Sequence, residues 1–177
     1  MNLTELPANL PVPIDDGAAD HLETKELPTV SLLATNEKTI TIRDLSGLIV
    51  VYIYPMTGRP GTPLPGARGC TPQSCCFRDH FSELQKLDAR VYGVSAQSSE
   101  YQREAKKRLH LPFELLSDSS LELKEALRLP TFKAGGMDLY KRITLIARDG
   151  IIEKVFYPVF PPSSNAEDVI EWLTTHA

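Results

Sequence analysis

The stretch from Leu48 to Asp79 constrains the fold more than any other part of the chain. It begins with LIVVYIY, an unbroken run of aliphatic, β-branched and aromatic residues, which is typical of a central strand covered on both faces. Residues 55–69 follow with four prolines and four glycines, a composition that continues neither a strand nor a helix. Cys70 stands directly after this loop. The stretch therefore predicts a buried strand, a long loop and a helix that begins near a cysteine.

The expected helix gives Cys70 a distinctive environment. Thr71 is a good N-cap residue, and Pro72 suits the first helical position because its missing N–H would have no partner there. We therefore expect Cys70 at a helix N-terminus, where unpaired N–H groups and the positive end of the helix dipole favour a thiolate. Phe77 and Leu84 recur at helical spacing and predict a buried face. Cys70 lies on this face, seven residues before Phe77, so its thiol should point inward.

The rest of the chain alternates strands and helices around this unit. The predicted order is β-β-β-α-β-α-β-α-β-β-α, which indicates an α/β protein with a mixed central β-sheet flanked by helices in three layers. Asp149-Gly150 between two apolar runs predicts a hairpin. Residues 1–26 are rich in proline and are interpreted as an N-terminal arm, which leaves 27–177 as one domain.

Composition and cysteine usage exclude several classes of protein. The formal net charge of −4 gives no reason to expect nucleic acid or an anionic membrane as a partner. The first residues lack the features of a secretory signal, and no stretch is long enough to span a bilayer, so we expect a cytoplasmic protein. The three cysteines cluster within seven residues, unlike a secreted disulfide framework. Such a cluster indicates redox or metal chemistry.

A family resemblance makes this chemistry specific. The segment GCTPQSC at 69–75, followed by FRD at 77–79, resembles the active-site segment of peroxiredoxins, which are thiol peroxidases with a thioredoxin-like fold. It is most similar to the peroxiredoxin Q or bacterioferritin comigratory protein class. The segments LPTVSLLATNEKTITIRDLSGLIVVYIYP, VYGVSAQS and LPFELLSD are similar to corresponding stretches of the family. The likeness covers the chain from about Leu27 onward.

This resemblance implies a site and a reaction. It implies that Cys70 is the peroxidatic cysteine and Cys75 the resolving cysteine. Arg142, in an R-x-T-hydrophobic pattern before a strand, is implied as the activating cation, whereas the residues alone leave Arg68 and Arg78 as candidates too. The reaction would reduce hydrogen peroxide and organic hydroperoxides through a cysteine sulfenic acid and an intramolecular disulfide. Thioredoxin or a similar dithiol would recycle the protein, a monomer or weak homodimer, without cofactor or metal.

The spacing of the two cysteines adds a structural requirement. Five residues along a helix give about 7.5 Å of rise and about 140° of rotation, whereas a disulfide needs Cα atoms about 4.4–6.8 Å apart with the side chains facing one another. Cys70 and Cys75 therefore cannot bond while the helix is intact. We expect the helix to unwind locally before the disulfide forms.

Two positions depart from the class pattern. Ala67 stands where the family has a threonine whose hydroxyl bonds the thiolate and the peroxide, and Thr71, Thr62 or a backbone N–H are the available substitutes. Cys76 adjoins Cys75 at a position that is not normally cysteine. Its two interpretations are a half-buried small residue and a backup resolving thiol.

Other functions remain as alternatives. A peroxide sensor would use the same sulfenic-acid chemistry without turnover. A thioredoxin-like thiol-disulfide oxidoreductase normally separates its cysteines by two residues, whereas four separate Cys70 and Cys75. A metal site would combine Cys76 and His80 with Cys70 or Cys75, but a closed structural zinc site needs four ligands. A cysteine hydrolase would need a histidine beside Cys70, and none lies in a recognisable context.

Overall fold

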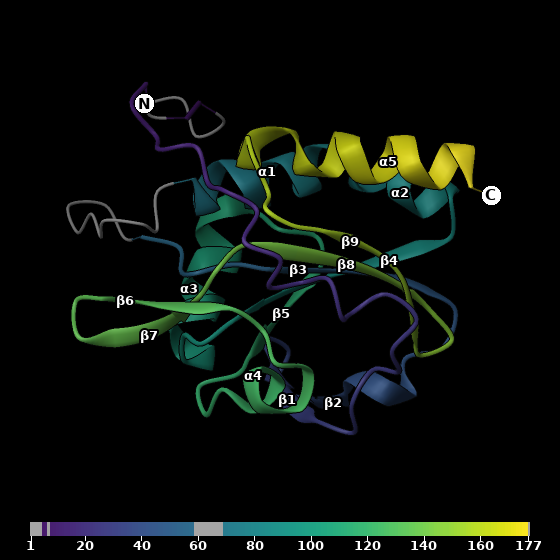
Figure 1. Cartoon of the computed structure of the whole chain (residues 1–177), viewed down its shortest axis with the longest axis horizontal. Helices are drawn as coiled ribbons and strands as arrows, with labels where there is room; N and C mark the ends of the chain where they lie inside the picture. The colour runs from purple at the N-terminus through teal and green to yellow at the C-terminus, as the bar shows by residue number, and fades with distance from the viewer. Residues whose placement is uncertain (1–4, 7, 59–68, 177) are drawn as a thin grey trace.

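The computed structural model describes residues 5–6, 8–58 and 69–176 (Figure 1). Its strands are β1 (Ser31–Ala34), β2 (Thr39–Thr41), β3 (Leu48–Ile53), β4 (Ala89–Ser95), β5 (Glu114–Ser117), β6 (Thr131–Ala134), β7 (Met137–Tyr140), β8 (Ile143–Arg148) and β9 (Ile151–Phe156). Its helices are α1 (Cys70–Asp79), α2 (Phe81–Lys86), α3 (Ser99–Leu109), α4 (Glu122–Leu127) and α5 (Asn165–Thr175), with 3-10 turns η1 (Ile42–Asp44) and η2 (Pro162–Ser164).

The described strands form a large mixed sheet with β3 near its centre. Their order is β2-β1-β5-β4-β3-β8-β9, and β6 and β7 form a separate hairpin. β3 pairs in parallel with β4 and antiparallel with β8, so that Val50 lies between Val91 and Ile146. All six residues of β3 are buried. This confirms the central strand predicted from the apolar run.

Helices cover both faces of the sheet, as Figure 1 shows. One face carries α1, α2, α3 and α5, which pack against alternate β3 residues such as Tyr52. The opposite face carries α4, η1 and part of the N-terminal segment, which pack against the intervening β3 residues such as Val51. The predicted three-layer α/β arrangement is therefore confirmed. It places α1, with all three cysteines, on one face of the central strands.

Several local predictions were wrong. The sequence pattern predicts one helix after the loop, but α1 ends at Asp79 and α2 begins at Phe81. Gly69, not Thr71, is the N-cap of α1. The β6–β7 hairpin was not predicted, although Gly135 and Gly136 both have positive φ between its strands. Such a Gly-Gly pair is a hairpin signal.

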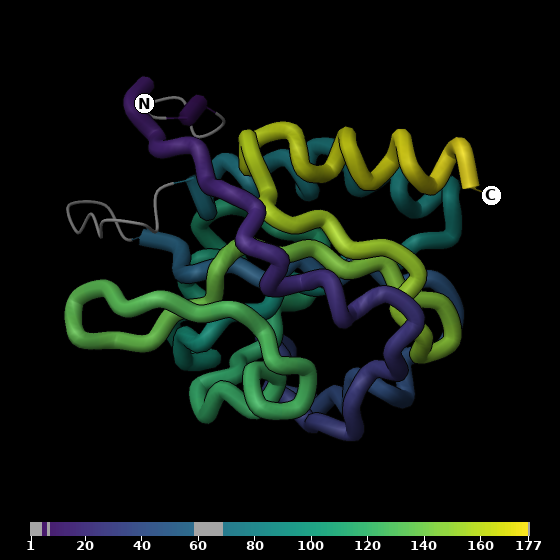
Figure 2. Tube along the Cα trace, viewed as in Figure 1, coloured from purple at the N-terminus to yellow at the C-terminus, as the bar shows by residue number. Residues whose placement is uncertain are grey.

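The N-terminal segment packs more closely than an extended arm would. Leu22 is fully buried in the core, and Glu26 forms a bridge with Ile151 at the start of β9. Figure 2 shows this segment crossing the molecule before it reaches β1. The boundary at residue 26 stays a prediction. Within the described residues, no helix is long and apolar enough to cross a membrane.

Candidate active site

Helix α1 is fixed on the central strand by an aromatic contact. The ring of Tyr52 in β3 stacks on Phe77, with ring centroids 4.6 Å apart. The Tyr52 hydroxyl also lies 3.1 Å from Ser74 Oγ, and both side chains are buried. Because Ser74 and Phe77 follow Cys70 by about one and two helical turns, these contacts set the position of the helix start. Cys70 is the first residue of α1 and is only 1% exposed.

The residue before Cys70 has to be glycine. Gly69 has φ +102°, a left-handed conformation that side chains with a Cβ rarely adopt. A Cβ at this position would lie 3.1 Å from Pro162 Cγ and 3.4 Å from Arg142 Nη2. The backbone therefore approaches η2 and Arg142 closely, which brings the start of α1 against both.

Arg142 lies directly beside the Cys70 thiol. It precedes β8, and its Nη1 is 2.9 Å from Cys70 Sγ and 3.0 Å from Gln73 Oε1. Because a guanidinium stays charged and presents several donors, it stabilises a thiolate and can also donate to a bound oxygen. Arg78 instead pairs with Asp79 at 2.9 Å. Of the three candidate arginines, Arg142 is the one found beside Cys70; Arg68, like Ala67 and Thr62, lies outside the described residues.

The residues that hold Arg142 in place were not predicted from the sequence. Gln73 is fully buried, and its Nε2 donates to Asn165 Oδ1 at 3.1 Å. Thr144 Oγ1 donates to the same Asn165 oxygen at 2.7 Å. A signal for Gln73 existed, because a residue three positions after Cys70 lies on the same helix face. Asn165 had no such signal, since only the fold brings α5 to α1.

Cys75 is fully buried within α1, and all three cysteines are free thiols. Burial raises the pKa of the Cys75 thiol, while Arg78 acts in the opposite direction. The thiol is therefore a poor nucleophile inside the intact helix. The structure therefore shows the reduced protein with α1 intact from Cys70 to Asp79.

Cys76 is also buried, at 5% exposure, and not half-buried as one interpretation expected. Its sulfur lies near the start of α5, where the backbone N–H groups of Ala166 and Glu167 act to lower the pKa of the thiol. Burial nevertheless raises the pKa of the Cys76 thiol. Cys70 and Cys76 therefore approach two different groups of partners: Arg142 at one end of α1, and α5 towards the other.

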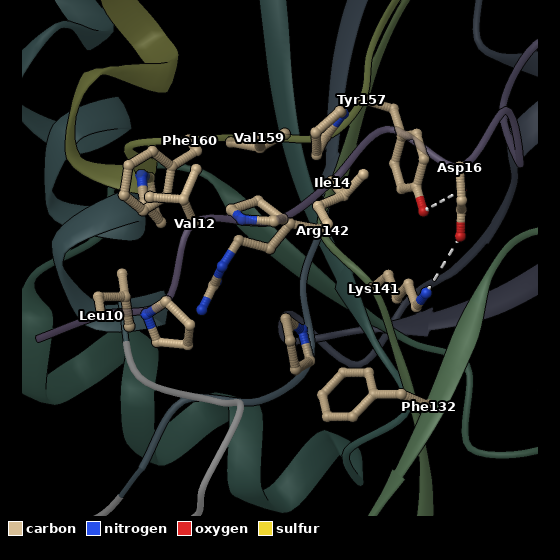
Figure 3. Close-up of a pocket in the computed structure, with 15 residues that line it drawn as sticks. Leu10, Val12, Ile14, Asp16, Phe132, Lys141, Arg142, Tyr157, Val159 and Phe160 are labelled. Carbon is tan, nitrogen blue, oxygen red and sulfur yellow. Dashed lines mark hydrogen bonds and ion pairs between the residues drawn. The ribbon is translucent and has the colours of Figure 1, made fainter.

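An apolar groove reaches Arg142 from the molecular surface (Figure 3). Its volume is about 930 Å³, within the range of small-molecule sites. In Figure 3 the side chains of Leu10 and Val12, from the N-terminal segment, and of Phe160, from the segment before α5, lie near the Arg142 side chain. Asp16, at one end, accepts hydrogen bonds from Lys141 at 3.3 Å and Tyr157 at 2.8 Å. The groove therefore offers a largely apolar wall with Arg142 as a cation in it.

Comparison with known proteins agrees with this geometry. The Redoxin family model matches residues 22–170. Peroxiredoxin Bcp of Escherichia coli is 35% identical over 156 residues, which cover 85% of this chain and 94% of that protein. The chloroplastic peroxiredoxin Q of Suaeda salsa is 26% identical over 147 residues, which cover 82% of this chain. The chain spans only 64% of the length of that plant relative.

The solved structures show the same fold. The bacterioferritin comigratory protein of Xanthomonas campestris, studied for its alkyl peroxide reduction activity, matches with a TM-score of 0.70 and 21% identity. The match covers 97% of this chain and 96% of that one. At this identity the likeness speaks for the arrangement of strands and helices alone.

Proposed function

Because the chain belongs to the redoxin family, in the peroxiredoxin Q and Bcp class, we propose that it is a thiol peroxidase. The observation that carries the proposal is the 2.9 Å contact between Cys70 Sγ and Arg142 Nη1 at the start of α1. A guanidinium beside a cysteine stabilises the thiolate, which is the nucleophilic form. The same guanidinium can hold the oxygen on which negative charge develops.

In the first step, the Cys70 thiolate attacks the terminal oxygen of the hydroperoxide. The S–O bond forms as the O–O bond breaks, and the departing oxygen takes a proton from solvent to become water or an alcohol. Cys70 is left as a sulfenic acid. Arg142 stabilises the charge that moves from sulfur to the departing oxygen, and Gln73 keeps its Nη1 in place. No metal or cofactor is needed for this electron count.

In the second step, Cys75 resolves the sulfenic acid. Its buried thiol must first leave the intact helix, so α1 unwinds, and the sulfur of Cys75 attacks that of Cys70. The S–S bond forms, hydroxide leaves, and the proton of Cys75 completes a water molecule. Thioredoxin or a similar dithiol then reduces the disulfide by thiol–disulfide exchange.

The substrates are hydrogen peroxide and organic hydroperoxides. The groove beside Arg142 supports the second group, because Val12 and Phe160 offer apolar contact to an alkyl chain. The hydroperoxide end would lie against Arg142, the lining residue that also contacts Cys70.

The protein would act in the cytoplasm, as a monomer or weak homodimer. The N-terminal segment covers the start of the edge strand β9, which supports this oligomeric state. The Thr24 N–H donates to the Ile152 carbonyl, and the Ile152 N–H donates to the Lys25 carbonyl. Strand edges that are already paired offer less surface for sheet extension. Sedimentation at increasing protein concentration and cell fractionation test these two statements.

The function is tested by peroxide turnover with thioredoxin, thioredoxin reductase and NADPH. We expect turnover in the wild type and in Cys76→Ser, and none in Cys70→Ser. Cys75→Ser should oxidise at Cys70 once but not turn over. Mass spectrometry of the oxidised wild type should find a Cys70–Cys75 disulfide. Stoichiometric oxidation of Cys70 without turnover with any dithiol would instead identify a peroxide sensor, and turnover in Cys70→Ser would overturn the mechanism.

A further inference from the structure

Three potential metal ligands meet where α1 contacts α5, outside the proposed mechanism. Cys76 and His80 come from α1 and its C-cap, and Glu167 from the first turn of α5. Their ligand atoms all lie within 4.8 Å of one another. The cluster contains neither Cys70 nor Cys75. Glu167 is the ligand that the sequence could not supply, because it lies far from Cys76 in the chain.

The orientation of His80 suits a metal ligand. Its Nδ1 lies 2.9 Å from the Cys76 carbonyl oxygen, so Nδ1–H donates there in the neutral ring and Nε2 keeps a lone pair. Nε2 faces Glu167 Oε1 at 3.7 Å. A histidine that donates one ring N–H to a backbone carbonyl is typical of metal sites. Two ligands of one tetrahedral zinc lie roughly 3.3–3.6 Å apart, and the 3.7 Å between Nε2 and Glu167 Oε1 is close to this separation.

Cys76 supplies the soft ligand. Its sulfur lies 3.9 Å from His80 Nδ1 and near the first backbone N–H groups of α5. Backbone N–H groups stabilise a metal-bound thiolate. The positive charge of the metal ion also compensates the negative charge of the buried Cys76 thiolate. Metal binding releases the thiol proton to solvent. Thiolate, imidazole and carboxylate together favour zinc over magnesium or calcium.

We propose that Cys76, His80 and Glu167 form a zinc-binding site that joins the C-terminal part of α1 to the N-terminus of α5. Three protein ligands leave a fourth position for water on the side of the exposed Glu167, the pattern of an open zinc site. Cys76 adjoins Cys75, so bound zinc holds Cys75 within the helix. Zinc therefore slows formation of the Cys70–Cys75 disulfide. This effect rests on the proposed peroxidase function, whereas zinc binding does not.

Binding is tested first, without any assay of activity. In reduced protein carrying Cys70→Ser and Cys75→Ser, Cys76 is the one remaining thiol. Titration with Co²⁺ should give one equivalent with a thiolate-to-cobalt charge-transfer band, and Zn²⁺ should displace it. Adding Cys76→Ser should abolish the band, and Glu167→Gln should weaken binding more than about tenfold.

The matched control is Glu171→Gln, which removes the same charge one turn further along α5, from another exposed position. It should bind like its parent. Circular dichroism should show that Glu167→Gln, an exposed substitution, is folded. Absence of the charge-transfer band, or equal binding by Glu167→Gln and Glu171→Gln, would overturn the site.

The effect on catalysis is tested by stopped-flow oxidation of the protein with wild-type cysteines. Zinc should leave the rate of Cys70 oxidation by peroxide within about twofold, and should slow disulfide formation at least about tenfold. The sulfenic acid trapped by dimedone should rise accordingly. Glu167→Gln should show neither change. If Co²⁺ and Zn²⁺ bind as described but disulfide formation keeps its rate, the proposal that bound zinc restrains the unwinding of α1 is wrong.

Discussion

Replacing Gln73 by methionine tests whether Arg142 needs to be held in place. Methionine keeps a similar length but removes both the acceptor for Arg142 Nη1 and the donor to Asn165. Arg142 keeps its contact with Cys70 Sγ. The charge of the guanidinium is unchanged, so any loss of rate reports on its position.

The magnitude follows from the hydrogen bond that is lost. A bond to a charged group contributes about 1.5–3 kcal/mol. The Gln73–Arg142 bond is present before the reaction as well as in the transition state, so only part of this energy affects the rate. We expect a loss of about 1.4 kcal/mol in transition-state stabilisation, which is a tenfold slower oxidation of Cys70. The free energy of unfolding should fall by about 1–2 kcal/mol, because buried groups lose partners.

The assay is the second-order rate of Cys70 oxidation by hydrogen peroxide, followed by intrinsic fluorescence or by competition with a second peroxidase. The control is Gln85→Met, the same substitution at an exposed position of α2, which should keep the wild-type rate. Gln73→Glu is a second probe, since a carboxylate would compete with the thiolate for Arg142 and should slow oxidation further. If Gln73→Met reacts within about twofold of wild type, Gln73 does not position Arg142.

Three further predictions address the loop, the buried thiols and the groove. Gly69→Ala should lower the free energy of unfolding by about 1–3 kcal/mol and slow Cys70 oxidation, because its Cβ meets Pro162 and Arg142. Gly47 also has a positive φ, +76°, but open space around its Cβ position, so Gly47→Ala should lower stability without affecting oxidation. Urea unfolding and stopped-flow kinetics measure both effects. The stability of the reduced protein should fall as the pH rises above about 8.5, because burial raises the pKa of Cys75 and Cys76 in the folded state, so that the unfolded chain releases these protons first. Urea titrations at pH 7.5 and 9.5 should show a smaller fall in the variant with Cys75→Ser and Cys76→Ser, and an equal fall would contradict the assignment. Phe160→Ser should lower kcat/KM for cumene hydroperoxide about tenfold, as loss of an apolar contact to the substrate predicts, with hydrogen peroxide as the unaffected control; equal losses for both substrates would count against the groove.

The sequence predicts the parts of the fold that local patterns determine. The apolar run of β3 identifies a central strand, because such a run can be stable only when both faces are covered. Asp149-Gly150 identifies the β8–β9 hairpin, and both residues do have positive φ. The β6–β7 hairpin was missed because its strands are short and most of their residues are at least partly exposed. Such strands show little hydrophobic alternation in the sequence.

The site was predictable only where a residue lies close to Cys70 in the chain or within a recognisable motif. Arg142 was selected by resemblance, because nothing in its local sequence separates it from a surface arginine. Asn165 and Glu167 could not be found, since their roles arise from the packing of α5 on α1. The break between α1 and α2 at His80 was missed because Phe77 and Leu84 keep helical spacing across it.

The segment from Pro162 to Glu167 connects the two steps of the proposed reaction. Pro162 lies close to Gly69, Asn165 accepts a hydrogen bond from Gln73, and the first turn of α5 lies beside Cys76. The first two contacts support the position of Arg142, which peroxide reduction needs. All three must loosen if α1 is to unwind for the disulfide. A more stable contact between this segment and α1 therefore favours attack on peroxide and opposes resolution, so the segment is where the balance between the two steps is set.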